Sequence, residues 1–178
     1  SVTQFYEDSI SIILTVYNQE ELIERVFKGI VDNMSDNVKE IIVVIDGSTD
    51  RSEQIIKDLA KDVKVPVHYE YTPNVNETKA NNAGLILAKY RYSIIVQDDC
   101  IIKEKDFDKR LLKPFKRLNG VLAVSGRNSE DAYPGEDGKI RYYNLAGQHQ
   151  GTPSNLAGTR RGSTRWRWMC DSASAAEL

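Results

Sequence analysis

The chain has 178 residues, enough for one compact domain with a sizeable core, and 40% of them are hydrophobic and 28% charged. Its formal net charge of −2, with both signs interspersed, gives no support to broad electrostatic binding of nucleic acid or an anionic membrane. No apolar stretch is long enough to span a bilayer, so no transmembrane segment is expected within this sequence.

The first predicted element is a buried strand over residues 10–16, an apolar run that is rich in β-branched side chains. A helix is predicted over residues 19–34, because its apolar side chains recur at helical spacing. Asn18 is the expected N-cap of this helix, with Glu21 as its capping-box partner.

The same alternation of strand and helix continues along the chain. Residues 40–45 have almost no polar alternation, which is typical of a strand covered on both faces in a parallel sheet. Ser48 is expected to cap the following helix. Residues 65–71 alternate apolar and polar side chains, which indicates a less buried strand nearer the edge, and a third helix is expected over residues 78–89.

The last regular elements are a strand over residues 92–96, a helix marked by apolar residues between 107 and 115, and a strand over residues 121–125. Because strands and helices alternate throughout, the predicted fold class is α/β. We expect a mainly parallel sheet with helices on both faces, similar to a Rossmann sandwich.

The composition changes after Gly126. Residues 127–165 are rich in Gly, Ser, Asn, Pro and Arg without sustained periodicity, which predicts a flap or a disordered segment. We therefore divide the chain into an α/β domain over residues 1–126 and a second part over residues 127–178.

Near the end of the chain, Trp166 and Trp168 are flanked by Arg165 and Arg167. Such side chains can stack on sugars and bind phosphate, but a strand whose tryptophans pack on the core is the favoured interpretation.

Acidic and basic side chains occur where ligands bind open parallel sheets, beyond the carboxyl ends of the strands. Asp46 directly follows an apolar strand, and Gly47 permits a tight turn after it, so this carboxylate is placed to bind a base or ribose; a simple turn and cap is an equal alternative. Asp98 and Asp99 follow another strand and offer the oxygen ligands that hard divalent cations prefer, with a solvated loop pair as the alternative.

Lys79 lies at the start of a predicted helix, where the free N–H groups favour anions, although most surface lysines are merely solvated.

Four motifs taken together resemble family 2 glycosyltransferases of the GT-A fold. They are Leu14-Thr15-Val16-Tyr17-Asn18, Val44-Ile45-Asp46-Gly47-Ser48-Thr49-Asp50, Ala80-Asn81-Asn82-Ala83-Gly84 and Val96-Gln97-Asp98-Asp99. No single motif is specific, but their order and spacing are, and the resemblance covers about residues 8–125. It implies an inverting enzyme of polysaccharide biosynthesis that uses a nucleotide-diphospho-sugar, in particular a UDP-sugar, together with Mn²⁺ or Mg²⁺.

The resemblance also implies roles for individual residues. Thr15, Tyr17, Asn18 and Asp46 match positions that hold the nucleoside, and the region of Lys79 matches a basic position near the base or phosphate. Residues 97–99 match the Asp-x-Asp metal motif, with Gln97 in place of its first acid. Asp99 is then the expected metal ligand and Asp98 a further contact to the nucleotide. A shift by one residue, which makes Asp98 the ligand, is the alternative.

The acid that such enzymes supply as general base has no convincing match, and the catalytic residues stay unassigned. We expect the chain to be truncated before its acceptor-binding half and to transfer sugar poorly on its own; turnover would direct attention to Asp131, Glu136 and Asp137. A catalytically silent nucleotide-sugar binder and a nucleotidyltransferase are the competing interpretations, although the glycine-rich loop expected of the latter is missing.

The expected partners are a nucleotide-sugar donor and a sugar or lipid-linked acceptor, with no nucleic acid. Cys100 and Cys170 do not form a CxxC pair, and His68 and His149 lie far apart, so a structural zinc site is not expected. This cysteine usage fits a reducing cytoplasm, and we expect a cytoplasmic location or peripheral attachment at the inner face of the membrane.

Overall fold

The computed structural model describes residues 7–125, 132–134, 140–143, 149–150 and 168–171. Among these residues, the larger of two sheets has six strands and is accompanied by four helices, α2 to α5, and the second sheet has three short strands. The elements are β1 (Ile10–Val16), α2 (Ile23–Asn33), β2 (Val38–Asp46), α3 (Ser52–Ala60), β3 (Val67–Thr72), α4 (Glu77–Leu87), β4 (Tyr92–Gln97), α5 (Phe107–Arg117), β5 (Ala123–Ser125), β6 (Ala132–Pro134), β7 (Ile140–Tyr143), β8 (His149–Gln150) and β9 (Trp168–Asp171).

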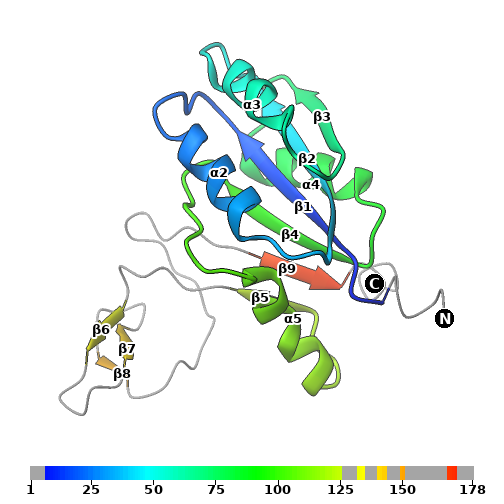
Figure 1. Ribbon diagram of the computed structural model, residues 1–178, viewed down its shortest axis with the longest axis vertical. Helices are drawn as coiled ribbons and strands as arrows, with labels where there is room; N and C mark the ends of the chain where they lie inside the picture. Colours follow the sequence, from blue (N-terminus) through cyan, green and yellow to red (C-terminus); the bar gives the residue numbers. More distant parts are fainter. Residues whose placement is uncertain (1–6, 126–131, 135–139, 144–148, 151–167, 172–178) are drawn as a thin grey trace.

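The strand order of the large sheet is β3-β2-β1-β4-β9-β5. Strands β1 to β4 are parallel to one another, and β9 runs antiparallel to both of its neighbours (Figure 1). The chain therefore builds β1, β2 and β3 outwards in one direction and then places β4 on the other side of β1. The position of β3 at the edge confirms the prediction from its alternating sequence.

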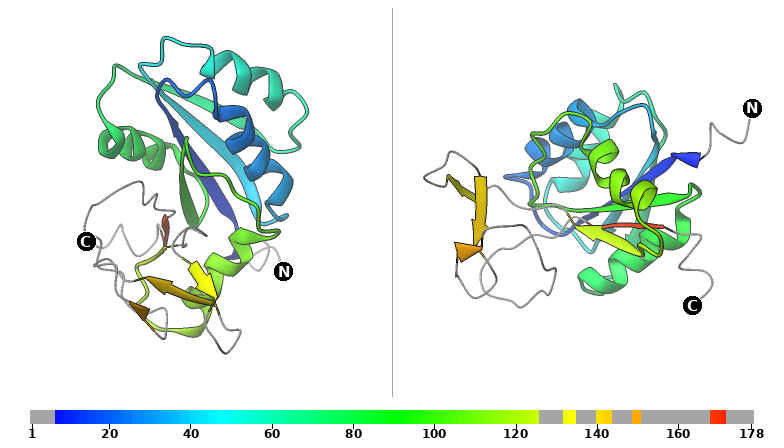
Figure 2. Two further views of the ribbon diagram at one scale, coloured as in Figure 1. Left: turned by 90° about the vertical axis from the view of Figure 1, so that its left-hand side faces the viewer. Right: turned by 90° about the horizontal axis from the view of Figure 1, so that it is seen from below.

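The two faces of this sheet are covered by different helices (Figure 2). Side chains of α2, α3 and α5 pack on one face in the main core cluster, around Phe27, Ile56 and Leu111. Helix α4 covers the other face, where Ala80 packs with Ile13 and Val44 in a smaller cluster. The expected α/β class with helices on both faces is confirmed.

Helix α4 lies close to the sheet because it carries Gly84. A Cβ at this position would stand 2.4 Å from Cγ2 of Ile13, closer than packed side chains allow, and 3.1 Å from Cγ2 of Val44. Gly84 therefore brings the helix against β1 and β2, and so positions the first turn of α4 at the end of the sheet where these strands finish.

Two predicted helix starts are wrong. Helix α2 begins at Ile23 after Leu22, without a side-chain cap, and α3 begins at Ser52 after Arg51. Asn18 and Ser48 were the expected caps, but their side-chain oxygens bond groups in other parts of the chain, as described below. The sequence pattern at each position resembles a helix cap, but the polar side chain bonds a residue about 30 positions away instead of the start of the helix.

The segment over residues 127–165 is described in part. Strands β6, β7 and β8 within it form a small antiparallel sheet, whereas the rest of the predicted flap lies outside the described residues. Trp166, Arg165 and Arg167 also lie outside them. Trp168 opens β9, whose backbone pairs with β4 and β5, so residues from the end of the chain complete the large sheet.

None of the helices in the described part of the chain is both long and apolar enough to cross a membrane.

Candidate functional site

The connections that follow β1, β2, β3 and β4 leave the same end of the sheet, and we call residues 17–22, 47–51, 73–76 and 98–100 the carboxyl rim. The strand order reverses between β1 and β4, and ligands of open α/β sheets bind outside the strand ends at such a reversal. The rim next to β1 and β4 is therefore the first place to look for a ligand.

A hydrogen bond bridges this reversal point. The backbone N–H of Tyr17, just after β1, donates to Oδ2 of Asp98, just after β4, at 2.8 Å. The Tyr17 side chain is 48% exposed, and its hydroxyl accepts a long contact of 3.5 Å from Nδ2 of Asn74. Tyr17 thus presents an exposed ring between the connections after β1, β3 and β4.

Asp46, the last residue of β2, is almost fully buried at the rim, with 4% of its surface exposed. Its Oδ1 accepts hydrogen bonds from Oγ1 of Thr72 and from the backbone N–H of Val75, both at 2.7 Å. These bonds join the end of β2 to the connection between β3 and α4. Both end on Oδ1, which leaves Oδ2 as the oxygen that a bound molecule would reach.

The turn after Asp46 depends on a glycine. Gly47 has φ of +71°, a conformation that residues with side chains rarely adopt, and a Cβ there would lie 2.9 Å from the backbone nitrogen of Asn74. The turn therefore brings the connections after β2 and β3 into direct contact beside Asp46.

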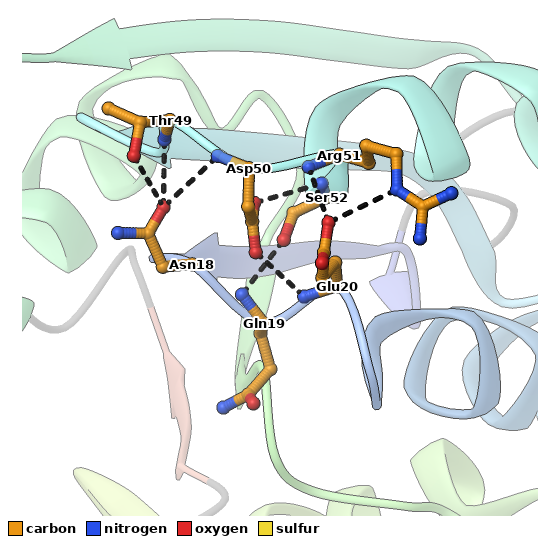
Figure 3. A network of polar contacts seen from close by, with 7 residues as sticks. All are labelled: Asn18, Gln19, Glu20, Thr49, Asp50, Arg51 and Ser52. Carbon is orange, nitrogen blue, oxygen red and sulfur yellow. Dashed lines mark hydrogen bonds and ion pairs between the residues drawn. The ribbon is translucent and has the colours of Figure 1, made fainter.

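The connection after β1 is joined to the connection after β2 by a network of hydrogen bonds, which we call the loop clamp, residues 18–20 and 48–52 (Figure 3 draws all of them except Ser48). From the first connection, the N–H groups of Asn18, Gln19 and Glu20 donate to side-chain oxygens of the second. The acceptors are Ser48 at 3.1 Å, Ser52 at 2.8 Å and Asp50 at 2.9 Å.

The second connection donates in return. Oδ1 of Asn18 accepts from the backbone N–H of Thr49 at 2.7 Å, with longer contacts from the Thr49 hydroxyl and the Asp50 N–H at 3.4 Å. Oε2 of Glu20 accepts from the backbone N–H of Arg51 at 3.0 Å and from its side-chain Nε at 3.2 Å. Because the bonds run both ways, neither connection can move alone without breaking several of them.

Asp50 is an acceptor on both sides of the clamp, since it also accepts from the N–H of Ser52 at 3.0 Å. Desolvation raises its pKa, but hydrogen bonds from Ser52 and from backbone N–H groups outweigh this effect and hold the pKa of the carboxyl below its usual value. A depressed carboxyl pKa contributes stability above the unfolded-state value that is lost as the pH falls through the folded-state value. The clamp is therefore complete at neutral pH and weakens in acid.

The remaining predicted site residues have fewer contacts with this set. Thr15 is buried near the end of β1. Lys79 is exposed in the first turn of α4, where its backbone N–H donates to Oδ1 of Asn76 at 3.4 Å. Asp99 follows Asp98 in the turn after β4, and one of its carboxylate oxygens is buried.

The start of α4 also meets the end of β4, because Gln97 donates from Nε2 to the carboxylate of Glu77. One turn further along α4, Oδ1 of Asn81 is buried and has no hydrogen-bond partner among the described residues. In the same part of the chain, no group of three or more His, Cys, Asp or Glu side chains is arranged to hold a metal ion without other ligands.

The structure thus brings Tyr17 and Asp98 together, and it places Asn18 in the connection after β1 and Asp46 at the end of the neighbouring strand β2. No pattern in the sequence points to Glu20, Ser52, Thr72 or Asn74 as members of this site. Their partners lie between 26 and 57 residues away, and no local pattern indicates such pairs.

The amino-acid sequence is similar to those of known proteins. The family described as glycosyl transferase family 2 matches residues 11–171. The chain is 31% identical over 118 residues to glycosyltransferase GlyA of Streptococcus pneumoniae, which covers 66% of this chain and 16% of that protein. It is 30% identical over 147 residues to the poly-beta-1,6-N-acetyl-D-glucosamine synthase of Staphylococcus epidermidis, which covers 79% of this chain and 34% of that protein.

Solved structures show the same fold. The mannosyltransferase PcManGT from Pyrobaculum calidifontis, in complex with GDP-Man and Mn²⁺, has a TM-score of 0.60 at 21% identity and covers 68% of this chain and 36% of its own. Glucosyl-3-phosphoglycerate synthase from Mycobacterium tuberculosis, in complex with Mn²⁺, UDP and phosphoglyceric acid, has a TM-score of 0.54 at 21% identity, covering 70% and 46%. The chain spans less than half the length of each of these four proteins.

Proposed function

The chain belongs to glycosyl transferase family 2, and we propose from this membership that it is the donor-binding part of an inverting glycosyltransferase. The proposed donor is a nucleotide-diphospho-sugar, in particular a UDP-sugar, and the proposed acceptor is a hydroxyl of a sugar or of a lipid-linked sugar. The observation that carries this proposal is the bridged reversal point, where Tyr17 and Asp98 join beside the buried Asp46. We also propose a cytoplasmic location, with peripheral attachment at the inner face of the membrane as the alternative.

Asp46 is the proposed nucleoside anchor. Its Oδ1 is engaged by Thr72 and Val75, so its orientation is set before any ligand arrives. Its Oδ2 can then accept a hydrogen bond from the base or the ribose without loss of side-chain entropy. The exposed ring of Tyr17 supplies an apolar surface beside it, and Thr15 and Asn18 complete the nucleoside side of the proposed site.

The proposed diphosphate side lies between the end of β4 and the start of α4. Lys79 in the first turn of α4 offers a cation, and the free N–H groups of a helix start favour an anion. Asp98 lies at the boundary between the diphosphate side and the nucleoside side, where its carboxylate accepts the hydrogen bond from the N–H of Tyr17.

A divalent cation fits the donor set at this place. Asp98 and Asp99 supply hard oxygen ligands, and no group of three or more His, Cys, Asp or Glu side chains in the described residues is arranged to hold a metal, which leaves positions for phosphate oxygens and water. We propose Asp99 as the ligand of Mn²⁺ or Mg²⁺, with Asp98 as the alternative. When bound there, the cation would hold the diphosphate and stabilise the charge of the leaving group.

The decisive experiment is a calorimetric titration of UDP into the wild-type chain, with Mn²⁺ and with a chelator. We expect Mn²⁺ to tighten UDP binding by about tenfold or more, and UDP to tighten Mn²⁺ by the same factor, because coupling between two ligands is reciprocal. Asp99→Asn keeps the size of the side chain and removes its charge, so this coupling should disappear with little loss of stability.

The matched variant Asp98→Asn separates the two alignments of the metal motif. It should retain more of the coupling if Asp99 is the ligand, and less if Asp98 is. Failure of the wild type to bind UDP even with Mn²⁺ would overturn the donor proposal, whereas UDP binding that ignores the chelator would overturn the metal proposal alone.

The loop clamp supports a further prediction about Asn18, which has φ of +46° and donates and accepts across the two connections. Asn18→Gly tolerates this backbone conformation but removes the acceptor, and we expect UDP to bind roughly tenfold more weakly because the connection beside Tyr17 is then less ordered. Asn18→Asp also tolerates the conformation and keeps an acceptor oxygen, so it should retain most of the affinity. Equal losses in the two variants would show that the Nδ2 group, and not the clamp, is what Asn18 contributes.

A further inference from the structure

The exposed face of α5 consists entirely of cations. The helix has five exposed residues, and all of them are lysine or arginine: Lys109, Arg110, Lys113, Lys116 and Arg117. We call these five residues the basic face. The opposite side of the helix is apolar, and Phe107, Leu111 and Leu112 pack it into the main core.

The basic face concentrates positive charge, although the chain as a whole has a small negative net charge. Residues 103–117 carry seven lysines and arginines and three acids, whereas the whole chain has a net charge of −2. One of the three acids, Asp108, is fully buried and accepts hydrogen bonds from Ser35. The overall charge therefore conceals a local positive surface.

Exposed acids flank the basic face and pair with three of its members. Arg110 pairs with Glu104 at 2.8 Å, Lys109 approaches Asp106 at 3.8 Å, and Lys116 pairs with Asp8. Exposed ion pairs of this kind are weak, because water screens both charges. The lysine and arginine side chains can therefore exchange these partners for external anions at little cost.

Two large apolar side chains lie exposed directly after the helix. Leu118 is 62% exposed and Leu122 is 47% exposed. Helix α5 itself lies on the outside of the molecule, at the opposite end of the sheet from β3 (Figure 1). A surface of this composition combines cations that can contact lipid phosphates with leucines that can enter the boundary between headgroups and acyl chains.

We propose that the basic face of α5, with Leu118 and Leu122, binds the surface of an anionic lipid membrane. The cations from Lys109 to Arg117 extend about 12 Å along the helix, and a flat membrane can contact all of them at once. Nucleic acid would gain nothing from the two exposed leucines, and a long polyanion would also meet the acidic remainder of the chain. Charge complementarity at short range and exposed apolar side chains thus both favour a lipid surface.

The proposal does not depend on the nucleotide site, and its test uses the intact chain with vesicles. Co-sedimentation with vesicles of phosphatidylglycerol and phosphatidylcholine should capture the wild type, whereas vesicles of phosphatidylcholine alone should not. The double variant Lys113→Gln/Arg117→Gln should lower the partition coefficient roughly 25-fold, since each cation near an anionic membrane contributes a factor of about five. Raised salt should weaken the binding of the wild type in the same way.

A matched control removes two exposed lysines elsewhere, by Lys61→Gln/Lys64→Gln beyond α3, and should leave vesicle binding nearly unchanged. A second variant, Leu118→Ser/Leu122→Ser, should reduce the binding that persists at high salt. The proposal is overturned if anionic vesicles do not capture the wild type, or if the control lowers binding as much as the α5 variant. It is also overturned if a DNA duplex binds as tightly as the vesicles and with the same dependence on α5.

Discussion

Replacement of Asp46 by alanine is expected to weaken UDP binding by roughly 10- to 100-fold and to lower the free energy of unfolding by about 1–3 kcal/mol. The loss of affinity follows from the loss of a preoriented carboxylate oxygen at the proposed nucleoside site. The loss of stability follows because the N–H of Val75 and the hydroxyl of Thr72 both lose the acceptor that Asp46 supplies at 2.7 Å. Calorimetry with UDP and urea denaturation measure the two effects separately.

Asp46→Asn distinguishes the ligand-binding role from the structural one. The amide oxygen can accept the bonds from Thr72 and Val75, so the free energy of unfolding should change by less than about 1 kcal/mol. Its NH₂ group then occupies the position of Oδ2 and cannot accept a hydrogen bond from a nucleoside. We therefore expect this variant to be nearly as stable as the wild type but to bind UDP as poorly as Asp46→Ala. Wild-type affinity in Asp46→Asn would remove Asp46 from the nucleotide site.

The largest effect on stability is expected from Glu40, whose side chain is buried at the other end of the sheet, with 2% of its surface exposed. Its Oε1 accepts from the hydroxyl of Ser11 at 2.7 Å and from the backbone N–H of Lys89 at 2.9 Å, and Nε2 of His68 lies 3.5 Å from Oε2. One carboxylate thus joins β1, β2, β3 and the connection that leads into β4. Glu40→Ala should lower the free energy of unfolding by about 2–4 kcal/mol, because the buried hydroxyl of Ser11 and the partly buried N–H of Lys89 both lose their acceptor.

His68→Gln is the matched control for Glu40. The His68 side chain is 44% exposed, so its contact with Glu40 is screened by water and its replacement should change the free energy of unfolding by less than about 1 kcal/mol. Chemical denaturation of both variants at neutral pH measures the difference. If Glu40→Ala lost no more stability than His68→Gln, the hydrogen bonds from Ser11 and Lys89 to Glu40 would not contribute to the stability of the fold as we expect.

The elements of the large sheet were predictable where their sequence is strongly patterned. The apolar run at 10–16 is β1 to the residue, and the run at 40–45 lies inside β2 (Val38–Asp46), because strands buried on both faces need continuous apolar sequence. The alternating segment at 65–71 corresponds to the edge strand β3. An edge strand is less buried than a central strand, so it needs fewer apolar residues. The α/β class follows from these patterns alone.

The local sequence gave wrong predictions where a polar side chain can form a hydrogen bond with either a near or a distant partner. Asn18 followed by Glu21 has the spacing of a capping box, yet Asn18 bonds Thr49 and the helix begins at Ile23. A capping bond and a clamp bond are similar in strength, so only the approach of the connection after β2 decides between them. The wrong helix start and the unforeseen clamp have this single cause.

By itself, the sequence determined the α/β class, the strands that form the centre of the sheet, and the acidic residues that follow β2 and β4. Such features depend on neighbours along the chain, through hydrophobic periodicity and the directions of side chains. Only the tertiary structure decided that Tyr17 bonds Asp98, that Glu40 is buried among three strands, and that β9 enters the sheet between β4 and β5. The reason is that hydrogen bonds and strand pairs between residues far apart in the chain form only after the packed core has brought them together, and they leave no periodic pattern in the sequence.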